Sequence, residues 1–135
     1  MKKLLPAAAI IAAVFAWQHY RDAPESAGVT GDAVEDLQSG DTITGEGTVV
    51  RILADDNEGS RHQRFILELA SGRTLLITHN IDVGLRIESL REGDRVEFSG
   101  IYEPNGRGGV VHWTHHDPQE QHVPGWLRHA GRTYD

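Results

Sequence analysis

The chain contains 135 residues, of which 39% are hydrophobic and 24% are charged, and this composition is typical of one globular domain with its own core. It has no cysteine, which excludes disulfide bonds and metal sites built on thiolates. Its formal net charge of −7 at pH 7 disfavours loose, non-specific attraction to nucleic acid.

The N-terminal segment differs in composition from the rest of the chain. Lys2 and Lys3 precede an apolar run from Leu4 to Trp17 that is too short for a comfortable membrane span. This pattern predicts an export signal over residues 1–16, and a retained membrane anchor is the alternative. The mature protein is therefore expected in the periplasm or outside the cell, or attached to the inner membrane through this segment.

Residues 17–41 are expected to form a flexible linker, because most of them are small or polar and show no periodicity. Within the linker, Asp32 is a suitable N-cap for a short helix from Ala33 to Gln38, which Gly40 would end. The folded domain is then predicted to span residues 42–135, including a C-terminal tail.

From Thr42 onward the chain shows short segments rich in Val, Ile, Leu and Phe, separated by Gly, Asn and Asp, which is a strand pattern. It predicts strands over residues 43–54, 62–70, 73–79, 95–102 and 108–113, and a short helix over 82–90. Five strands with one helix between the third and the fourth predict a mainly β, OB-fold-like barrel. A small open barrel or a sandwich of another topology is the alternative.

A tight turn at Ser71 and Gly72 sets the expected pairing of the second and third strands. If Ala70 pairs with Arg73, then Arg64 faces His79 across the sheet.

The third and fifth strands of an OB-fold run parallel, so the ends of these two strands are expected at the same end of the barrel, together with the loop from Asp55 to Ser60. Polar groups from separate segments would then converge there. They are His62, Arg64, His79, Asn80, Asp82, His112, His115, His116 and Asp117.

Strand alternation divides the segment GGVVHWTHHDP, residues 108–118, into two faces. Val111 and Trp113 are expected in the core, with His112 and His116 on the outer face. The alternative for His62 and His79 is structural, because both could close the barrel mouth and bond to neighbouring backbone.

The segments RHQRFIL and HWTHHDP, together with LADDNEGS, THNID and the later PGW, resemble the small bacterial family labelled domain of unknown function 3465. The resemblance covers residues 45–134. It implies a compact exported domain and no particular activity.

The convergent polar groups suggest a metal-assisted phosphodiesterase or nuclease, because histidine transfers protons near neutral pH and arginine neutralises charge on a phosphoryl oxygen. A divalent ion (Zn, Mg or Ca) would activate water. The expected catalytic residues are His62, Arg64, His116 and Arg61; the expected substrate-binding residues are Gln63, His79, Asn80 and Trp113; the expected metal ligands are His112, His116, Asp117 and Asp82.

Two other functions fit the same pattern. The barrel could be a non-catalytic binding module for an oligonucleotide, an oligosaccharide or an envelope peptide. It could also be an envelope scaffold whose clustered histidines repel one another below about pH 6.5. In each case we expect a monomer without a disulfide partner.

Overall fold

The computed structural model describes residues 29–30 and 36–135. The predicted signal or anchor over residues 1–16 lies outside the described residues, as does most of the predicted linker. Of the helix expected at residues 33–38, only the last three residues are described, and of these only Asp36 has a helical (3-10) conformation. The described residues contain no apolar helix of membrane-spanning length.

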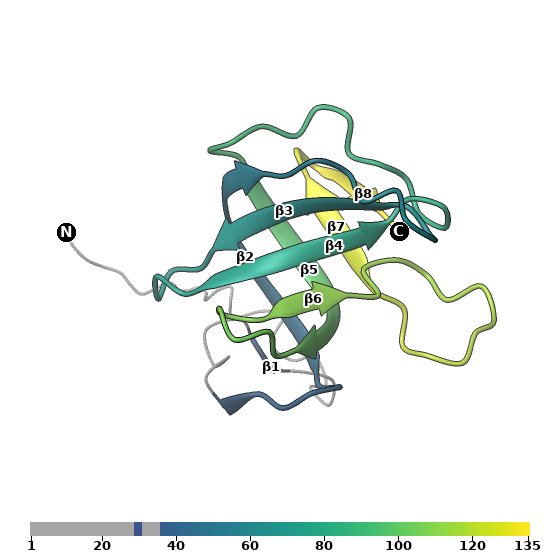
Figure 1. The fold of residues 1–135 in the computed structure, drawn as a ribbon, viewed down its shortest axis with the longest axis horizontal. Helices are drawn as coiled ribbons and strands as arrows, with labels where there is room; N and C mark the ends of the chain where they lie inside the picture. Colours follow the sequence, from purple (N-terminus) through teal and green to yellow (C-terminus); the bar gives the residue numbers. More distant parts are fainter. Residues whose placement is uncertain (1–28, 31–35) are drawn as a thin grey trace.

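The described chain is built from strands and turns (Figure 1). The strands are β1 (Val29–Thr30), β2 (Thr42–Ile52), β3 (His62–Glu68), β4 (Thr74–Asn80), β5 (Arg95–Glu103), β6 (Val110–His112), β7 (Trp126–His129) and β8 (Arg132–Tyr134).

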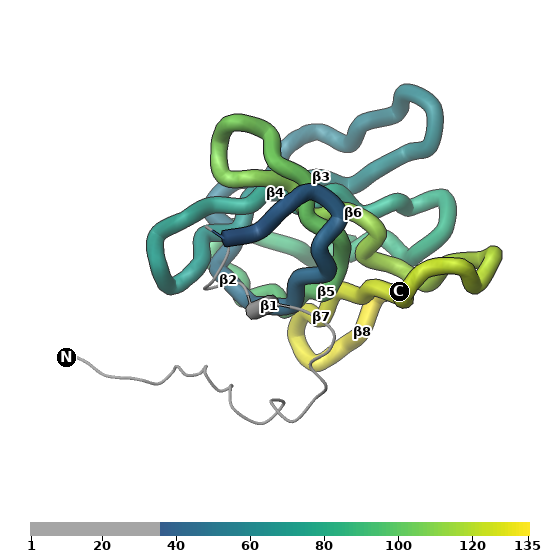
Figure 2. The backbone as a smooth tube through the Cα atoms, turned by 90° about the horizontal axis from the view of Figure 1, so that it is seen from below, coloured from purple at the N-terminus to yellow at the C-terminus, as the bar shows by residue number. Residues whose placement is uncertain are grey.

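Five of these strands close into a barrel in the order β2, β3, β4, β6, β5, because β2 pairs with β5 as well as with β3 (Figures 1 and 2). Only β4 and β6 run parallel within this ring, whereas the other four pairs are antiparallel. This is the predicted OB-like arrangement, so the fold class is confirmed. The short β1, in the predicted linker, pairs with β2.

Strand β2 is long enough to pair with both β3 and β5. Its first half pairs with β5 up to Thr48, and from Thr48 onward it pairs with β3. The pairing register shifts between Val49 and Arg51, and such a bulge bends a strand. Gly47 precedes this bulge, and a Cβ there would approach the Glu68 carbonyl oxygen to 2.7 Å, so the close approach of β2 to β3 requires glycine.

The core follows from strand alternation. Along β3 and β4 the inward residues are buried and the outward ones are partly or fully exposed. The fully buried interior is dominated by large apolar side chains, among them Phe65, Leu67, Leu75, Ile77, Ile87 and Phe98.

The predicted register between β3 and β4 is wrong by one residue. Gln63, not Arg64, faces His79, and Arg64 faces Thr78. The connection is a three-residue loop closed by a hydrogen bond from the Leu69 N–H to the Arg73 carbonyl, with Gly72 at φ 90°. A glycine in the left-handed conformation at the end of a three-residue loop is a common hairpin geometry.

The helix predicted over residues 82–90 is not present; these residues form turns. A single helix-like hydrogen bond runs from the Gly84 N–H to the Asn80 carbonyl. Beyond it, side chains of the barrel bond to the backbone of Leu85 and Ile87. Val83, Gly84 and Ile87 are weak helix formers, so these tertiary bonds determine the local conformation.

The fifth barrel strand is shorter than predicted and ends at His112. Trp113 has φ 56°, a left-handed conformation that breaks the alternation. As a result, Trp113 is only half-buried, while Thr114 and His115 are buried.

The predicted C-terminal tail forms a hairpin of β7 and β8, with β7 paired to β5. The two turn residues, Ala130 and Gly131, have φ 52° and 80°, as a type I′ hairpin turn requires. Leu127 and Tyr134 are buried in the core, so the hairpin is part of the domain.

Candidate functional site

The predicted site lies at one end of the barrel, where the start of β3 meets the ends of β4 and β6. The parallel pairing of Leu76 with Val110 and Ile77 with Val111 brings the ends of β4 and β6 side by side, as the sequence predicts. The turns of residues 81–94 and the loop of residues 113–125 extend from the same end.

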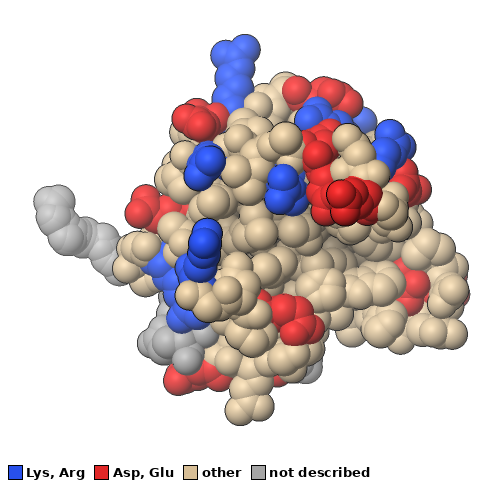
Figure 3. Space-filling model, in the orientation of Figure 1, with Lys and Arg blue, Asp and Glu red and all other residues tan. Residues whose placement is uncertain are grey.

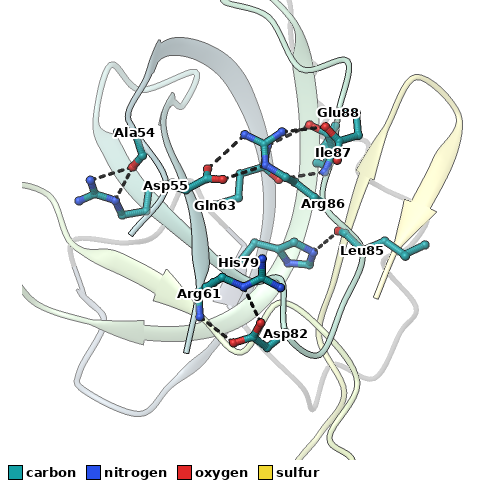
Figure 4. A network of polar contacts seen from close by, with 11 residues as sticks. Ala54, Asp55, Arg61, Gln63, His79, Asp82, Leu85, Arg86, Ile87 and Glu88 are labelled. Atoms are coloured by element: carbon teal, nitrogen blue, oxygen red, sulfur yellow. Dashed lines mark hydrogen bonds and ion pairs between the residues drawn. The ribbon is translucent and has the colours of Figure 1, made fainter. Parts of the chain in front are cut away.

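His79 connects these segments through both of its ring nitrogens, and Figure 4 shows the contact to Leu85. Its Nε2 lies 2.8 Å from the Leu85 carbonyl oxygen and its Nδ1 lies 2.7 Å from the Thr114 Oγ1. A carbonyl oxygen can only accept, so Nε2 carries the proton in the neutral ring, and Nδ1 accepts from the threonine hydroxyl. Burial lowers the pKa of His79 to about 4, and this predicted substrate-binding residue is therefore a neutral structural anchor at pH 7.

Gln63 has a comparable role (Figure 4). Its Nε2 donates to the Ile87 carbonyl, and its Oε1 accepts from the Ile87 N–H, both at 2.9 Å. Gln63 is 2% exposed and Ile87 is fully buried. The amide thus satisfies the backbone of a residue that closes the barrel end, and its polar atoms are buried together with that residue.

The arginines of this region are engaged with neighbouring groups (Figure 4). Arg61 donates to both carboxylate oxygens of Asp82, through its backbone N–H at 2.9 Å and its Nε at 2.8 Å. These bonds, the backbone one first, lower the pKa of Asp82. Arg64 donates through two nitrogens to the Ala54 carbonyl.

Asn80 accepts a hydrogen bond from the Asp82 N–H through its side-chain oxygen. A further ion pair connects the 81–94 turns to the loop before β3. Arg86 donates to both carboxylate oxygens of Asp55, at 3.0 and 3.1 Å. Together these bonds connect several of the segments at this end of the barrel.

The loop of residues 113–125 is organised by Asp117. Its carboxylate accepts hydrogen bonds from the backbone N–H groups of Gln119, Gln121 and His122 at 2.8 to 2.9 Å, and the first of these contributes most to lowering the pKa of Asp117. The ends of the loop meet where the Gly125 N–H donates to the His115 carbonyl. In Figures 1 and 2 the loop projects from the barrel as a yellow-green lobe.

Trp113 lies in this loop between two imidazoles, with ring centroids 5.1 Å from His115 and 4.7 Å from His122. His115 donates through Nδ1 to the His116 carbonyl, and burial lowers its pKa. Trp113 is thus held by packing within the loop.

The remaining candidates lie nearer the solvent. His62 is half-buried and its Nδ1 donates to the Ser60 carbonyl at 3.0 Å, so in the neutral ring its Nε2 lone pair is free for other interactions. His116 is exposed. His112 lies on the outer face of β6, with its Nε2 at 3.7 Å from the Glu103 Oε2.

The four predicted metal ligands do not converge. Among the described residues, no group of three or more His, Asp or Glu side chains is placed to hold one ion. Asp82 binds Arg61, Asp117 binds loop amides and His112 faces Glu103. The structure brings His79 and His115 together instead, with ring centroids 6.3 Å apart.

Sequence reasoning overlooked several partners in this region. Three of these partners contact candidate residues: Ile87 bonds to Gln63, Thr114 bonds to His79, and Glu103 lies near His112. The fourth, Arg86, pairs with Asp55, which was not a candidate. The contact between Glu103 and His112 could have been predicted from the sequence. β5 and β6 are consecutive strands, and strand alternation places both side chains on the outer face.

A search of the curated proteins found no match to this chain. A family model described as a protein of unknown function (DUF3465) matches residues 14–135, which include every described residue of the barrel. The chain therefore belongs to the DUF3465 family, as its histidine-rich segments indicated.

Proposed function

We propose that this protein is a binding module that holds an extended polypeptide segment on the outer face of β3, β4 and β6. The observation that carries the proposal is a row of aliphatic side chains across these strands. Ile66 pairs with Leu76, and Leu76 pairs with Val110. All three are partly exposed, and we refer to them as the aliphatic row.

The surroundings of the aliphatic row suit a polypeptide. Thr74 and Thr78 lie on either side of Leu76 along β4, and Arg51, opposite Ile66 on β2, is exposed. Most atoms on this side of the molecule belong to neither acidic nor basic residues (Figure 3). An aliphatic surface with hydroxyl groups, bordered by Arg51 beside Ile66 and by Glu103 beside Val110, favours a peptide with aliphatic side chains and an acidic flank at the Arg51 side.

Oligonucleotides fit this face less well. Proteins bind single-stranded nucleic acid largely by stacking bases on aromatic rings. Among the described residues, Phe65, Phe98, Tyr102 and Tyr134 are buried in the core, and Trp113 belongs to the 113–125 loop. Trp126 is on β7, with the Arg128 guanidinium 4.2 Å from its ring centroid. None of these aromatic rings lies on the outer face of β3, β4 and β6.

A defined peptide series tests the proposal. Synthetic peptides with a central aliphatic triplet and acidic, neutral or basic flanks would be titrated into the full-length protein by calorimetry and by amide chemical-shift mapping. We expect saturable binding, tightest for acidic flanks, with shifts confined to β3, β4 and β6.

Leu76→Lys should weaken binding at least about tenfold, the loss of about 1.4 kcal/mol, whereas the control Thr133→Lys, at an exposed position of β8, should not. Binding that survives Leu76→Lys, or binding of oligonucleotides at this face with no response to any peptide, would overturn the proposal.

The phosphodiesterase hypothesis has a separate test. His62 and His116 are the two histidines among the expected catalytic residues; His62 is half-buried and His116 is exposed. DNA and RNA would be incubated with the protein and Mg, Ca, Mn or Zn. Cleavage that is lost in His62→Ala or His116→Ala would support the enzyme over the binding module. The export that we propose, with membrane attachment as its alternative, rests on the sequence of residues 1–16 alone.

A further inference from the structure

We propose that His112 and Glu103 form a binding site for a divalent transition metal ion, with Zn²⁺ as the representative ion, on the outer surface of β5 and β6. The inference is independent of the peptide proposal. It rests on the position of one ring nitrogen and one carboxylate oxygen.

The ring nitrogen is His112 Nε2. Its atom is buried and has no hydrogen-bond partner, although the side chain as a whole is 34% exposed. A buried polar nitrogen without a partner is costly, so a ligand that fills this position is favoured.

The carboxylate oxygen is Glu103 Oε2, at 3.7 Å from Nε2. That separation is too long for a hydrogen bond. Zinc binds imidazole nitrogen and carboxylate oxygen at about 2.0 to 2.2 Å, so two ligands of a tetrahedral ion lie roughly 3.4 Å apart. A shift of a few tenths of an ångström would therefore place both atoms on one ion.

Both side chains are fixed to rigid strands. Ile101 pairs with His112, and Glu103 pairs with Val110, so His112 and Glu103 are diagonal neighbours on the same face of the sheet. The buried Val111 and Tyr102 alternate with them and hold the two strands to the core. A site built on paired strands keeps its geometry better than one built on loops.

Ser39 supports the carboxylate. Its hydroxyl donates to Glu103 Oε1, which leaves Oε2 as the oxygen that faces His112. Metal-binding carboxylates are commonly held by such a neighbouring hydrogen bond.

Imidazole and carboxylate together suit zinc and neighbouring divalent ions. Two protein ligands leave the other coordination positions to water. The two side chains are 34% and 41% exposed, but Nε2 itself is buried, so the ion enters from the solvent side with a small movement of the ring or of the carboxylate. A site with two protein ligands is also consistent with the finding that no three ligating side chains converge among the described residues.

The test is a zinc titration of the full-length protein by calorimetry, with long-range proton–nitrogen NMR of the histidine rings. We expect one binding event that shifts the His112 Nε2 resonance to the position of a metal-bound nitrogen. The event should be lost in His112→Ala and in Glu103→Gln. Ser39→Ala should weaken it about tenfold, as losses of such supporting bonds do.

The matched control is the double variant with His116→Ala and His122→Ala, which removes two exposed imidazoles from the 113–125 loop. It should bind zinc as the wild type does. Circular dichroism confirms that each variant is folded. Zinc binding that is unchanged in His112→Ala, or a His112 resonance that does not move, would show that zinc does not bind at His112 and Glu103 and would overturn the proposal.

Discussion

His79 is a residue whose chemistry is determined by its burial. It is fully buried, it donates to the Leu85 carbonyl and it accepts from Thr114. Protonation would place a charge in the core and turn Nδ1 into a donor. The Thr114 hydroxyl would then have to donate elsewhere, and the Thr78 carbonyl, at 3.4 Å, is the available acceptor.

This environment predicts a pH-dependent stability. The pKa of His79 falls from 6.5 to about 4 on folding, so the unfolded chain binds the proton more tightly. The stability from the neutral ring is complete above pH 6.5 and is lost as the pH falls toward 4, on the order of 3 kcal/mol in total. Burial also lowers the pKa of His115, which adds a change in the same direction.

The measurement is urea unfolding at pH 7.5 and pH 4.5. His79→Gln should be less stable at pH 7.5 and should lose much of the difference between the two pH values. His116→Gln, at an exposed position, is the control and should keep the difference. A difference that is the same in His79→Gln and in the wild type would show that other groups cause it. Asp82, Asp94 and Asp117 contribute at lower pH, because their pKa values lie below 3.8.

At the scale of one element, the 113–125 loop depends on close backbone contact at its base. A Cβ on Gly125 would lie 1.9 Å from the Trp113 carbonyl oxygen and 2.6 Å from that of Ser99. Both neighbours are backbone atoms, so the clash cannot be relieved by a side-chain rotation. Trp113 is itself in a left-handed conformation, which costs about 1 to 3 kcal/mol and persists only where the surrounding contacts compensate for it.

Gly125→Ala should therefore open the loop and destabilise the domain by about 2 kcal/mol or more. Hydrogen exchange of the Gln119, Gln121 and His122 amides, which donate to Asp117, would report the opening. Gly131→Asn is the control, since nothing lies within 4 Å of a Cβ there and its φ of 80° is tolerated by asparagine. Protected amides in Gly125→Ala would contradict the expected clash.

The elements also show what a sequence can and cannot predict. The positions of the barrel strands follow from alternation, which depends on each residue and its near neighbours. The predicted β3–β4 register is wrong by one residue, because the register depends on whether Gly72 ends a loop of two residues or of three. The helix expected at 82–90 fails because Gln63 and His79 bind its backbone from other strands.

For the candidate site, the topology predicted which segments meet. The parallel β4 and β6 do bring His79 beside Thr114 and His115. It did not predict which atoms remain available to a ligand. That depends on partners distant in the sequence, such as Ile87 for Gln63 and Asp82 for Arg61, so residues that look functional by type are engaged in structural bonds.

At the scale of the whole molecule, the β7–β8 hairpin decides whether the domain is a barrel with a tail or one cooperative unit. β7 pairs with β5 from Val96 to Ser99, and Leu127 is fully buried. On β7, His129 also contacts Asp94 at 2.7 Å, through its Nε2. Both the sheet and the core therefore extend through the hairpin.

If the domain is one unit, Leu127→Ala should destabilise all of it by about 2 to 5 kcal/mol, the usual cost of removing a buried leucine side chain. Hydrogen exchange would show this as an equal loss of protection in the most protected amides of β3 and of β7, because both exchange through global unfolding. Thr133→Ala, at an exposed position of β8, should change neither. Faster exchange confined to residues 126–134, with β3 unaffected, would instead show that the hairpin unfolds separately while the five-stranded barrel remains closed.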